Sequence, residues 1–275
     1  MPGRVRSGIL VVDKTRGITS HDVVDQVRRL AGQDEVGHAG TLDPLATGVL
    51  VVALGKALKL LEFMESHDKE YEVAVRLGQR TDTDDAEGRV VAESAVPSRD
   101  EIEAAAGKLV GEIDQVPPAF SAIRQKGERL YEKARRGEVV EAKARRVRVD
   151  EFALLDWAPP VARFRVRCGK GTYVRALARD LGGHVVELRR TASGPFRIDD
   201  AAALAEPLDL MPMDAGLMGM AEMRLTTQDA RLFENGRMVD LRPPGPLVRV
   251  YCGPRFVGIG ETSDGKLKPR KVIVE

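Results

Sequence analysis

Two short segments of the chain alternate strictly between apolar and polar positions, and this pattern constrains the fold more than any other feature. In "YEVAVRL" (residues 71–77) every second side chain is apolar, and in "RFRVRC" the alternate positions are Arg163, Arg165 and Arg167. Successive side chains of a β-strand point to opposite faces, so each segment predicts a strand with one buried and one exposed face. The chain therefore contains a sheet covered on one side.

Helix signals are interspersed with these strands. Thr19 and Asp22 have the spacing of a capping box before a run of valines on one helical face, and Ser98 and Glu101 have the same spacing further on. Continuous apolar runs at 8–13 and 48–54 predict buried strands. The combination predicts the α+β (mixed α/β) class.

The segment "GKGTYVRALARDLG" (169–182) predicts a tight turn at its two glycines, followed by a short helix. Thr172 is the expected cap of this helix, which should begin with Tyr173 and Arg175.

The length of 275 residues allows one large domain with a small one beside it. An acidic stretch rich in Met and Ala (199–223) predicts a helical or irregular connection, after which a new cap, a short helix and strands begin. We therefore expect a domain boundary near residue 222, with domains at 1–222 and 223–275.

Composition excludes several classes of protein. The longest apolar runs, such as "GVLVVAL", are far shorter than the roughly 20 residues of a membrane span. The N-terminal segment lacks the apolar region of a secretory signal, which predicts a cytoplasmic protein. Cys168, Cys252 and four scattered histidines have no spacing typical of a metal site, so no metal is expected.

The net charge of +1 conceals blocks of opposite sign. Residues 124–148 and 163–190 each carry a net charge of +6, whereas residues 199–234 carry −6. This distribution is typical of a protein with one basic face for a polyanion. The alternative is that the charges only solvate helix surfaces; two separate basic segments with aromatic residues among them favour nucleic acid.

One carboxylate stands in an apolar, glycine-rich setting, "VGHAGTLDPLATGVL" (36–50). Pro44 favours an extended conformation of Asp43, and Gly40 and Gly48 permit close backbone approach on either side. The loop therefore suits a carboxylate that must be held still. The alternative is an ordinary turn, in which Asp43 accepts hydrogen bonds from nearby backbone N–H groups.

The acidic run "DTDDAEG" (82–88) superficially suggests a calcium-binding loop. Ala86 and Gly88 break the pattern of ligands that such a loop requires, so we interpret the run as a polar turn.

Several blocks together resemble the TruB family of bacterial tRNA pseudouridine synthases, which act on uridine 55 of the T arm. They are "DKTRGITSHDVV", "GHAGTLDPLATGVL", "YEVAVRLGQRTDTDDAEG", "VPPAFSAIRQKGERLYEKARRGEVVEAKARRVRV", "CGKGTYVRALARDLG" and "LRRTASGPF". These blocks run in family order from about residue 8 to 197. Two departures are Thr15, where the family usually has proline, and a shorter loop between Asp180 and His184, which affects the alignment of Leu188.

The resemblance implies a pseudouridine synthase fold with a mainly antiparallel central sheet. It implies a basic RNA-binding insertion at about 115–150 and a small β-rich, PUA-like RNA-binding domain at 223–275. The implied reaction breaks the bond between uracil N1 and ribose C1′, rotates the base and rejoins it through C5. This chemistry requires no metal or redox cofactor.

The resemblance also assigns the site residues. Asp43 is the expected nucleophile, which could add at C1′ or to the uracil ring, or could stabilise positive charge. Arg175 should keep that carboxylate charged, and a bidentate pair would also fix its orientation. Tyr71 should stack on the target base and help to move a proton. These three residues form the predicted catalytic set.

The base must leave its stack to react, which costs a few kcal/mol. By resemblance, His38 should enter the T loop when the target uridine is extruded. Tyr173 and Leu188 should line and close the pocket that receives the base.

Binding energy should come from basic residues that contact phosphates, which predicts salt-sensitive affinity. The expected RNA-binding surface comprises Arg124, Lys126, Arg129, Arg135, Arg136, Arg163, Arg165 and Arg167.

Two alternative functions remain open. The same surface could serve a tRNA-folding chaperone that needs no catalysis, or the chain could act within a guide-RNA particle. The absence of a long basic tail and the bacterial-type insertion oppose the second alternative. We expect a monomer that acts on the T-arm stem-loop of tRNA without a protein partner.

Overall fold

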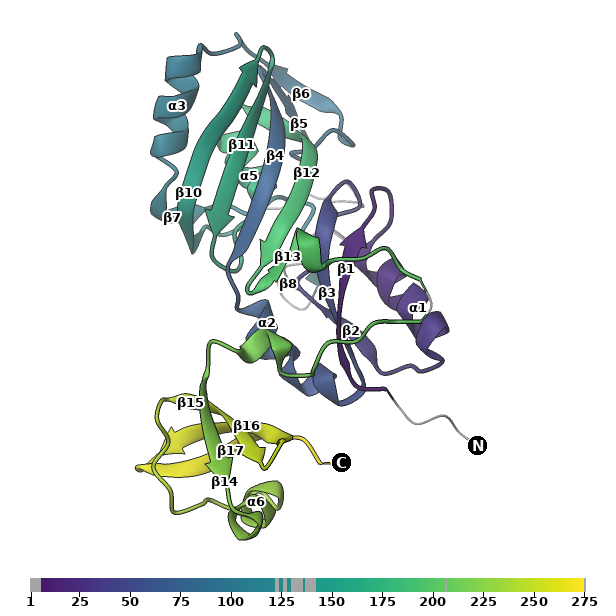
Figure 1. The fold of residues 1–275 in the computed structure, drawn as a ribbon. Helices are drawn as coiled ribbons and strands as arrows, with labels where there is room; N and C mark the ends of the chain where they lie inside the picture. Colours follow the sequence, from purple (N-terminus) through teal and green to yellow (C-terminus); the bar gives the residue numbers. More distant parts are fainter. Residues whose placement is uncertain are drawn as a thin grey trace.

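The chain folds around one large sheet, with a smaller sheet packed below it (Figure 1). The computed structural model describes residues 6–121, 124, 125, 128, 129, 136, 142–205 and 207–274. In the part of the chain so described, no helix is long and apolar enough to cross a membrane.

Every neighbouring pair of strands in the large sheet is antiparallel except one, β12 with β3. The main path runs in the order β1 (Gly8–Lys14), β3 (Thr47–Leu54), β12 (Gly183–Ser193), β4 (Lys69–Leu77), β11 (Val161–Cys168), β10 (Arg145–Ala158) and β7 (Gly111–Gln115). β2 (Val36–Ala39) also pairs with β3, and β13 (Phe196–Arg197) with β12. The prediction of a mainly antiparallel α+β fold is confirmed.

Helices cover this sheet. α1 (Ser20–Ala31) and α3 (Arg99–Gly107) both begin with the predicted capping boxes, in which Thr19 and Ser98 accept from backbone N–H groups of the first turn. α1 ends at Gly32, which has the left-handed conformation common after the last turn of a helix. The shorter elements η1 (Gly55–Leu60) and α2 (Leu61–Glu65) follow β3.

The third predicted helix starts one residue later than expected. α5 spans Val174–Asp180, and Tyr173 is its N-cap without a capping side-chain hydrogen bond. The hydroxyl of Thr172 donates instead to the carbonyl of Arg148, 3.3 Å away. The predicted cap at Thr172 is therefore wrong, because this side chain binds the neighbouring strand.

The two alternating segments form β4 and β11, which pair with each other. Tyr71 lies opposite Val166 and Val73 opposite Phe164, and all four side chains are buried in the main core. The predicted half-buried strands are confirmed. Since paired residues share a face, Arg163, Arg165 and Arg167 project from the opposite side of the sheet.

Several strands lack a clear sequence signal. β10 and β12 were not predicted, although both lie inside the sheet with a strand on either side. Register shifts interrupt the alternation of each, for example between Arg190 and Ala192. Four short strands lie outside the main sheet: β5 (Gln79–Thr81), β6 (Val90–Glu93), β8 (Arg124–Gln125) and β9 (Glu128–Arg129).

The C-terminal part is rich in β-structure, as expected. Its sheet has the order β14 (Ala221–Leu225), β15 (Leu247–Cys252), β16 (Arg255–Ser263) and β17 (Lys266–Val272), with α6 (Thr227–Glu234) beside it. The connection that precedes it is irregular apart from η2 (Ile198–Asp200) and η3 (Ala215–Leu217). The described part of 199–223 thus forms no α-helix.

Apolar and ionic contacts join the two sheets. Ile259 of the small sheet and Ile273, which follows β17, share a buried cluster with Val51 of the large sheet. Glu62 of α2 forms ion pairs with Lys271 and Arg270 of β17, at 2.6 and 3.5 Å. The small sheet is therefore packed on the large body.

The parallel seam between β12 and β3 depends on one glycine. Only Arg189 opposite Thr47 and Arg190 opposite Gly48 form this pairing. Gly48 has φ +97°, and a Cβ atom there would lie 2.2 Å from the backbone oxygen of Arg190. No side chain fits at this position without parting the two strands.

We expect Gly48→Ala to reduce the free energy of unfolding by about 3 kcal/mol, because strain and a backbone clash add together. Urea denaturation measures the loss. Gly171→Ala is the matched control, since Gly171 has φ +84° but no atom within 4 Å of the added Cβ. Equal losses in the two variants would show that the close approach contributes nothing.

Candidate active site

Asp43 lies in the turn that connects β2 to β3. Its carbonyl accepts from the N–H of Ala46 at 3.0 Å, and the carbonyl of Pro44 accepts from the N–H of Gly17 at 2.8 Å. Pro44 thus occupies the second position of a four-residue turn, where its fixed φ is favourable. The carboxylate remains 37% exposed.

Two buried side chains, neither of which was predicted, hold this turn from below. The Ser20 hydroxyl accepts from the N–H of Leu42 at 2.8 Å and donates to the Leu42 carbonyl at 3.0 Å. Lys14 Nζ donates to the carbonyls of Ile18 at 2.6 Å and Pro44 at 3.4 Å. The start of α1 and the end of β1 therefore fix the backbone on both sides of Asp43.

Burial lowers the pKa of Lys14 from 10.5 to about 8. Between these pH values the unfolded chain retains a proton that the folded chain has released. The contribution of Lys14 to stability therefore rises with pH across this window, by at most about 1.4 kcal/mol per pH unit.

We expect the wild type to gain stability relative to Lys14→Met between about pH 8 and about pH 10. Urea unfolding at the two pH values measures this difference. Lys108→Met, at an exposed position of the surface, corrects for the general titration of lysines. If the difference between wild type and Lys14→Met stays constant, Lys14 does not titrate in this window.

Arg175 approaches Asp43 from α5. Its side chain is only 6% exposed, and Nε lies 2.9 Å from Oδ2 of Asp43. The two Nη atoms donate to the backbone carbonyls of Thr83 and Phe120, both at 2.9 Å. A buried guanidinium thus sits behind a partly exposed carboxylate.

The expected bidentate pair between Asp43 and Arg175 does not form. Only Nε contacts the carboxylate, and its N–H is not aligned as a hydrogen bond. Charge attraction rather than a directed bond joins the two groups, because backbone carbonyls occupy the other nitrogens.

Asp85 is a further member of the site that sequence reasoning missed. It is buried, and its Oδ2 lies 3.5 Å from Nη1 of Arg175. Its Oδ1 accepts from the Thr83 hydroxyl at 2.6 Å and from the N–H of Glu87 at 3.1 Å. The interpretation of 82–88 as a polar turn accounts for its backbone conformation but does not predict that Asp85 is buried. The local sequence carries no signal for this burial.

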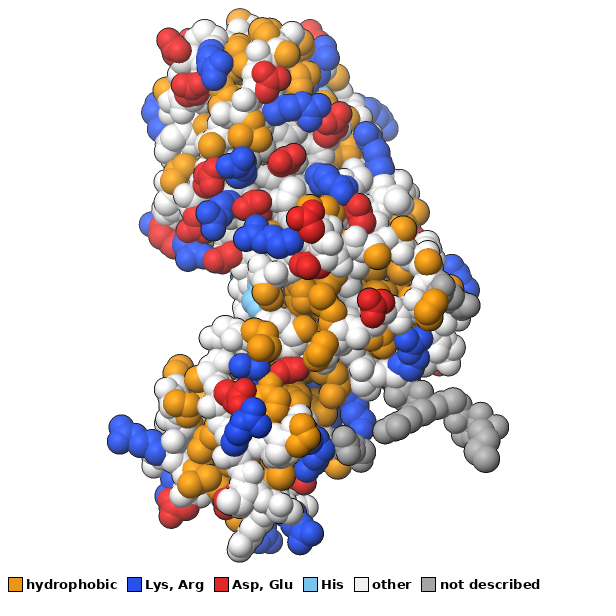
Figure 2. All heavy atoms as spheres, viewed as in Figure 1, with side chains coloured by type: hydrophobic (Ala, Val, Ile, Leu, Met, Phe, Trp, Pro, Cys, Tyr) orange, Lys and Arg blue, Asp and Glu red, His pale blue; other side chains and the backbone are white. Residues whose placement is uncertain are grey.

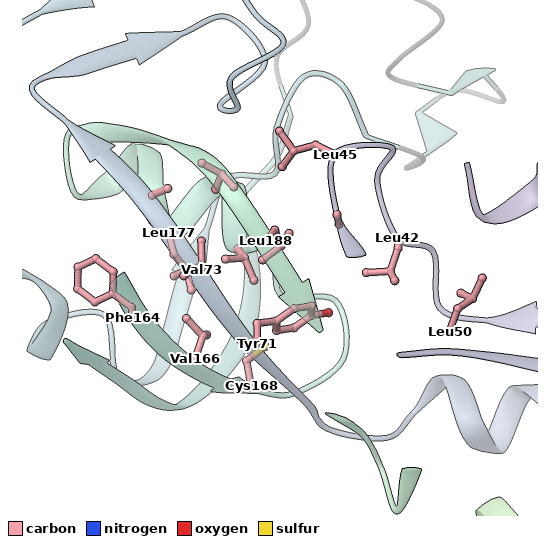
Figure 3. Close-up of a cluster of buried hydrophobic side chains, with 14 of the residues drawn as sticks. Leu42, Leu45, Leu50, Tyr71, Val73, Phe164, Val166, Cys168, Leu177 and Leu188 are labelled. Carbon is pink, nitrogen blue, oxygen red and sulfur yellow. The ribbon is translucent and has the colours of Figure 1, made fainter. Parts of the chain in front are cut away.

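Tyr71 and Leu188 lie together beside this turn. Figure 3 shows the Tyr71 ring next to Leu188 and Cys168, with its hydroxyl pointing toward the segment that carries Leu42. Tyr71 is 9% exposed, and burial raises the pKa of its hydroxyl above 10.0. The hydroxyl is therefore protonated at neutral pH and can donate a hydrogen bond.

Two family models match the chain. One, described as TruB family pseudouridylate synthase (N terminal domain), covers residues 28–174, and another, described as Pseudouridine synthase II TruB, C-terminal, covers residues 221–273. The first alone spans more than half of the 275 residues. The chain belongs to the TruB family of pseudouridine synthases.

Curated TruB relatives match along almost their whole length. A tRNA pseudouridine synthase B of Pseudomonas paraeruginosa (strain DSM 24068 / PA7) is 43% identical over 293 residues, covering 97% of this chain and 96% of the relative. A protein of the same name from Thermobifida fusca (strain YX) is 44% identical, covering 95% and 97%.

Solved structures share the TruB fold at lower identity. A chain of a Cbf5-Nop10-Gar1 complex is 25% identical with a TM-score of 0.74, covering 96% of this chain and 84% of that one. A chain of an H/ACA RNP bound to a substrate RNA containing 2′-deoxyuridine has the same TM-score at 22% identity, which shows the fold alone.

Tyr173 is the N-cap residue of α5, two positions before Arg175. The backbone N–H of Tyr173 donates to Oε1 of Gln115 at 2.8 Å, and Nε2 of Gln115 donates to the backbone carbonyl of Tyr173 at 3.1 Å. Burial raises the pKa of the Tyr173 hydroxyl, and the Asp43 charge acts in the same direction. The Tyr173 hydroxyl is therefore protonated at neutral pH.

His38 lies on β2, five residues before Asp43. Its Nδ1 is buried and has no hydrogen-bond partner among the described residues. Burial lowers the pKa of His38 below 6.5, and the positive charge of Arg190 lowers it further. The imidazole is thus neutral at physiological pH.

The arginine ladder of β11 does not reach the Asp43 side of the sheet. Arg163 pairs with Glu187 at 2.9 Å, Arg165 with Glu151 at 3.6 Å, and Arg167 with Glu70 at 3.7 Å. Figure 2 shows positive and negative side chains interspersed over this face of the TruB sheet. Strand alternation sends Tyr71 and these arginines to opposite faces of the sheet, and the role of the arginines in RNA binding stays a prediction.

The other predicted RNA contacts are only partly described. Lys126 and Arg135 lie outside the described residues, as do the side chains of Arg124 and Arg129, whose backbones belong to β8 and β9. Arg136 is exposed in a turn.

Part of the basic run 124–148 belongs to the main sheet. Arg146 and Arg148 lie in β10 and form ion pairs with Asp114 at 3.4 Å and Asp68 at 2.6 Å. Acidic neighbours therefore neutralise this end of the run.

Proposed function

We propose that this chain isomerises uridine 55 of the tRNA T loop to pseudouridine, with Asp43 as the catalytic carboxylate. The observation that carries the proposal is the pair of a buried Arg175 and a partly exposed Asp43, 2.9 Å apart. Membership of the TruB family and relatives named tRNA pseudouridine synthase B support the reaction and the class of RNA.

The isomerisation needs a charged carboxylate with a fixed position. The N1–C1′ bond breaks and a C5–C1′ bond forms, while C5 loses a proton and N1 gains one, so the composition of the nucleoside is unchanged. Asp43 could add to C1′ or to the ring, or could stabilise positive charge on the sugar. Each route uses the same geometry: an exposed carboxylate oxygen backed by the Arg175 charge.

The remaining site residues receive the extruded base. Tyr71 stacks on the base with its ring, and its hydroxyl, which burial keeps protonated at neutral pH, donates a hydrogen bond to it. Tyr173 and Leu188 line the pocket. His38, neutral because its pKa is lowered, stacks within the T loop and offsets the few kcal/mol that extrusion costs.

The wider organisation that we propose is a catalytic domain at 1–222 with an RNA-binding insertion, and a PUA-like RNA-binding domain at 223–275. Arg124, Lys126, Arg129, Arg135 and Arg136 are the proposed phosphate contacts. The affinity for tRNA should therefore fall as salt increases. The protein acts as a cytoplasmic monomer in this proposal.

A tRNA-folding chaperone is the second candidate function. Extrusion of a base already requires the T arm to be remodelled, so both functions can share one surface. The Asp43–Arg175 pair favours catalysis, because remodelling alone requires no carboxylate held beside a buried arginine. Curated relatives at 43% and 44% identity over nearly their whole length argue against a guide-RNA particle.

The decisive experiment incubates the purified chain alone with unmodified tRNA, followed by site-resolved pseudouridine mapping. We expect one pseudouridine, at position 55. Modification at another position would contradict the specificity, and remodelled but unmodified tRNA would indicate the chaperone. Activity only with added guide RNA would indicate the particle.

A further inference from the structure

Arg190 is the largest fully buried side chain of the described molecule, and the proposed mechanism does not use it. Its exposed fraction is 1%, and no acidic side chain among the described residues forms an ion pair with it. Burial of a cation without an acid is costly unless its N–H groups are satisfied. This guanidinium therefore must be held by other acceptors.

Backbone carbonyls from two separate segments hold the Arg190 guanidinium. Nε donates to the carbonyl of Val49 at 2.7 Å, and Nη2 donates to the carbonyl of Gly40 at 3.1 Å. Val49 belongs to β3, whereas Gly40 begins the loop that carries Asp43. One side chain thus fixes both ends of the catalytic turn.

The backbone of Arg190 lies where the two halves of the sheet meet. It pairs with Gly48 across the parallel seam and with Tyr71 across the antiparallel pairing to β4. Asp43 precedes β3, on one side of β12, and Tyr71 lies in β4, on the other side of β12. Arg190 is therefore placed between the two segments whose separation the reaction depends on.

The charge of Arg190 also reaches Tyr71. Burial raises the pKa of the Tyr71 hydroxyl, and the positive charge of Arg190 acts in the opposite direction. The same charge lowers the pKa of His38. Arg190 thus influences two of the proposed site residues, Tyr71 and His38.

We propose that Arg190 is a positioning residue, which holds the Asp43 turn and Tyr71 at a fixed separation across the seam of the sheet. The inference rests on the proposed function. It adds a residue that contacts no substrate but sets the geometry of two groups that do. A displacement of about 1 Å in such groups can reduce a rate by about 10²-fold.

The test compares wild type with Arg190→Lys, which keeps the charge but loses the planar fork, and with Arg190→Gln, which keeps donors without the charge. Arg189→Lys is the matched control, because Arg189 lies at the same seam but pairs with Asp13 at the surface. Each protein is labelled with 3-fluorotyrosine. The Tyr71 fluorine signal is assigned by its absence in Tyr71→Phe.

For Arg190→Lys we expect the single-turnover rate on tRNA to fall about 10²-fold while the Kd for tRNA changes by less than about threefold. The Tyr71 fluorine signal should shift, and the shift should also occur in Arg190→Gln. Arg189→Lys should change neither the rate nor the signal.

Full rate in both Arg190 variants would overturn the proposal. A loss of rate without a shift of the Tyr71 fluorine signal would also overturn it, because Arg190 would then not position Tyr71. Failure of both variants to fold would overturn it as well, because Arg190 would then serve general stability. A wild type that forms no pseudouridine would contradict the proposed function instead, and the fluorine signal would still report whether Arg190 positions Tyr71.

Discussion

Asp43→Asn is expected to reduce pseudouridine formation by at least about 10⁴-fold, which is the scale of loss when a catalytic nucleophile is removed. The amide has nearly the shape of the carboxylate, so the turn between β2 and β3 should persist. It carries no charge, however, and neither adds to C1′ or the ring nor stabilises positive charge. Pseudouridine mapping after prolonged incubation measures the residual rate, and filter binding measures the affinity for tRNA, which should remain close to that of wild type.

Asp13→Asn is a closely matched control for this substitution. The Asp13 side chain is 36% exposed, compared with 37% for Asp43, and it also forms an ion pair with an arginine, Arg189. The pair lies at the seam but outside the proposed pocket, so Asp13→Asn should retain turnover. Full turnover by Asp43→Asn would refute the catalytic role of Asp43, and equal loss in both variants would point to a structural effect.

Arg175→Lys should lower both activity and stability. The lysine keeps one positive charge but cannot reach Asp43 and the carbonyls of Thr83 and Phe120 together. We expect the rate to fall about 10²-fold and the free energy of unfolding to fall by about 2 kcal/mol, the contribution of two lost hydrogen bonds. Single-turnover kinetics and urea denaturation measure the two effects.

Arg179→Lys, one turn further along α5, separates these effects. Arg179 pairs with Asp84 at 3.1 Å and donates to the carbonyl of Val116 at 2.7 Å, so its replacement should cost similar stability. Its rate should stay within about threefold of wild type, because it does not contact Asp43. Retention of the full rate by Arg175→Lys would show that a single charge behind Asp43 is sufficient.

The sequence was most informative where a structural cause is local. The capping boxes at Thr19 and Ser98 join residues three positions apart, so their spacing alone locates α1 and α3. The alternation in 71–77 and 163–168 is likewise a property of single strands, and it identified β4 and β11 with the correct buried faces. Asp43 was recognisable because the whole motif around it resembles a known family.

Local patterns failed where tertiary contacts set the burial of charged residues. β12 carries Arg190 on a buried face and contains register shifts, so its alternation is hidden. The arginines of β11 have acidic partners that the segment itself does not show: Glu187 of β12, Glu151 of β10 and Glu70 of β4. Charge pairing between strands depends on sheet order, which no single segment records.

By itself, then, the sequence determined the class of fold, the starts of α1 and α3, the half-buried strands and the carboxylate around which the site is built. Only the tertiary structure decided what surrounds that carboxylate: a single contact from Arg175, with Asp85 behind it and Ser20 and Lys14 below. These groups come from segments far apart in the chain. They become buried, and their hydrogen bonds form, only when the folded chain brings these segments together.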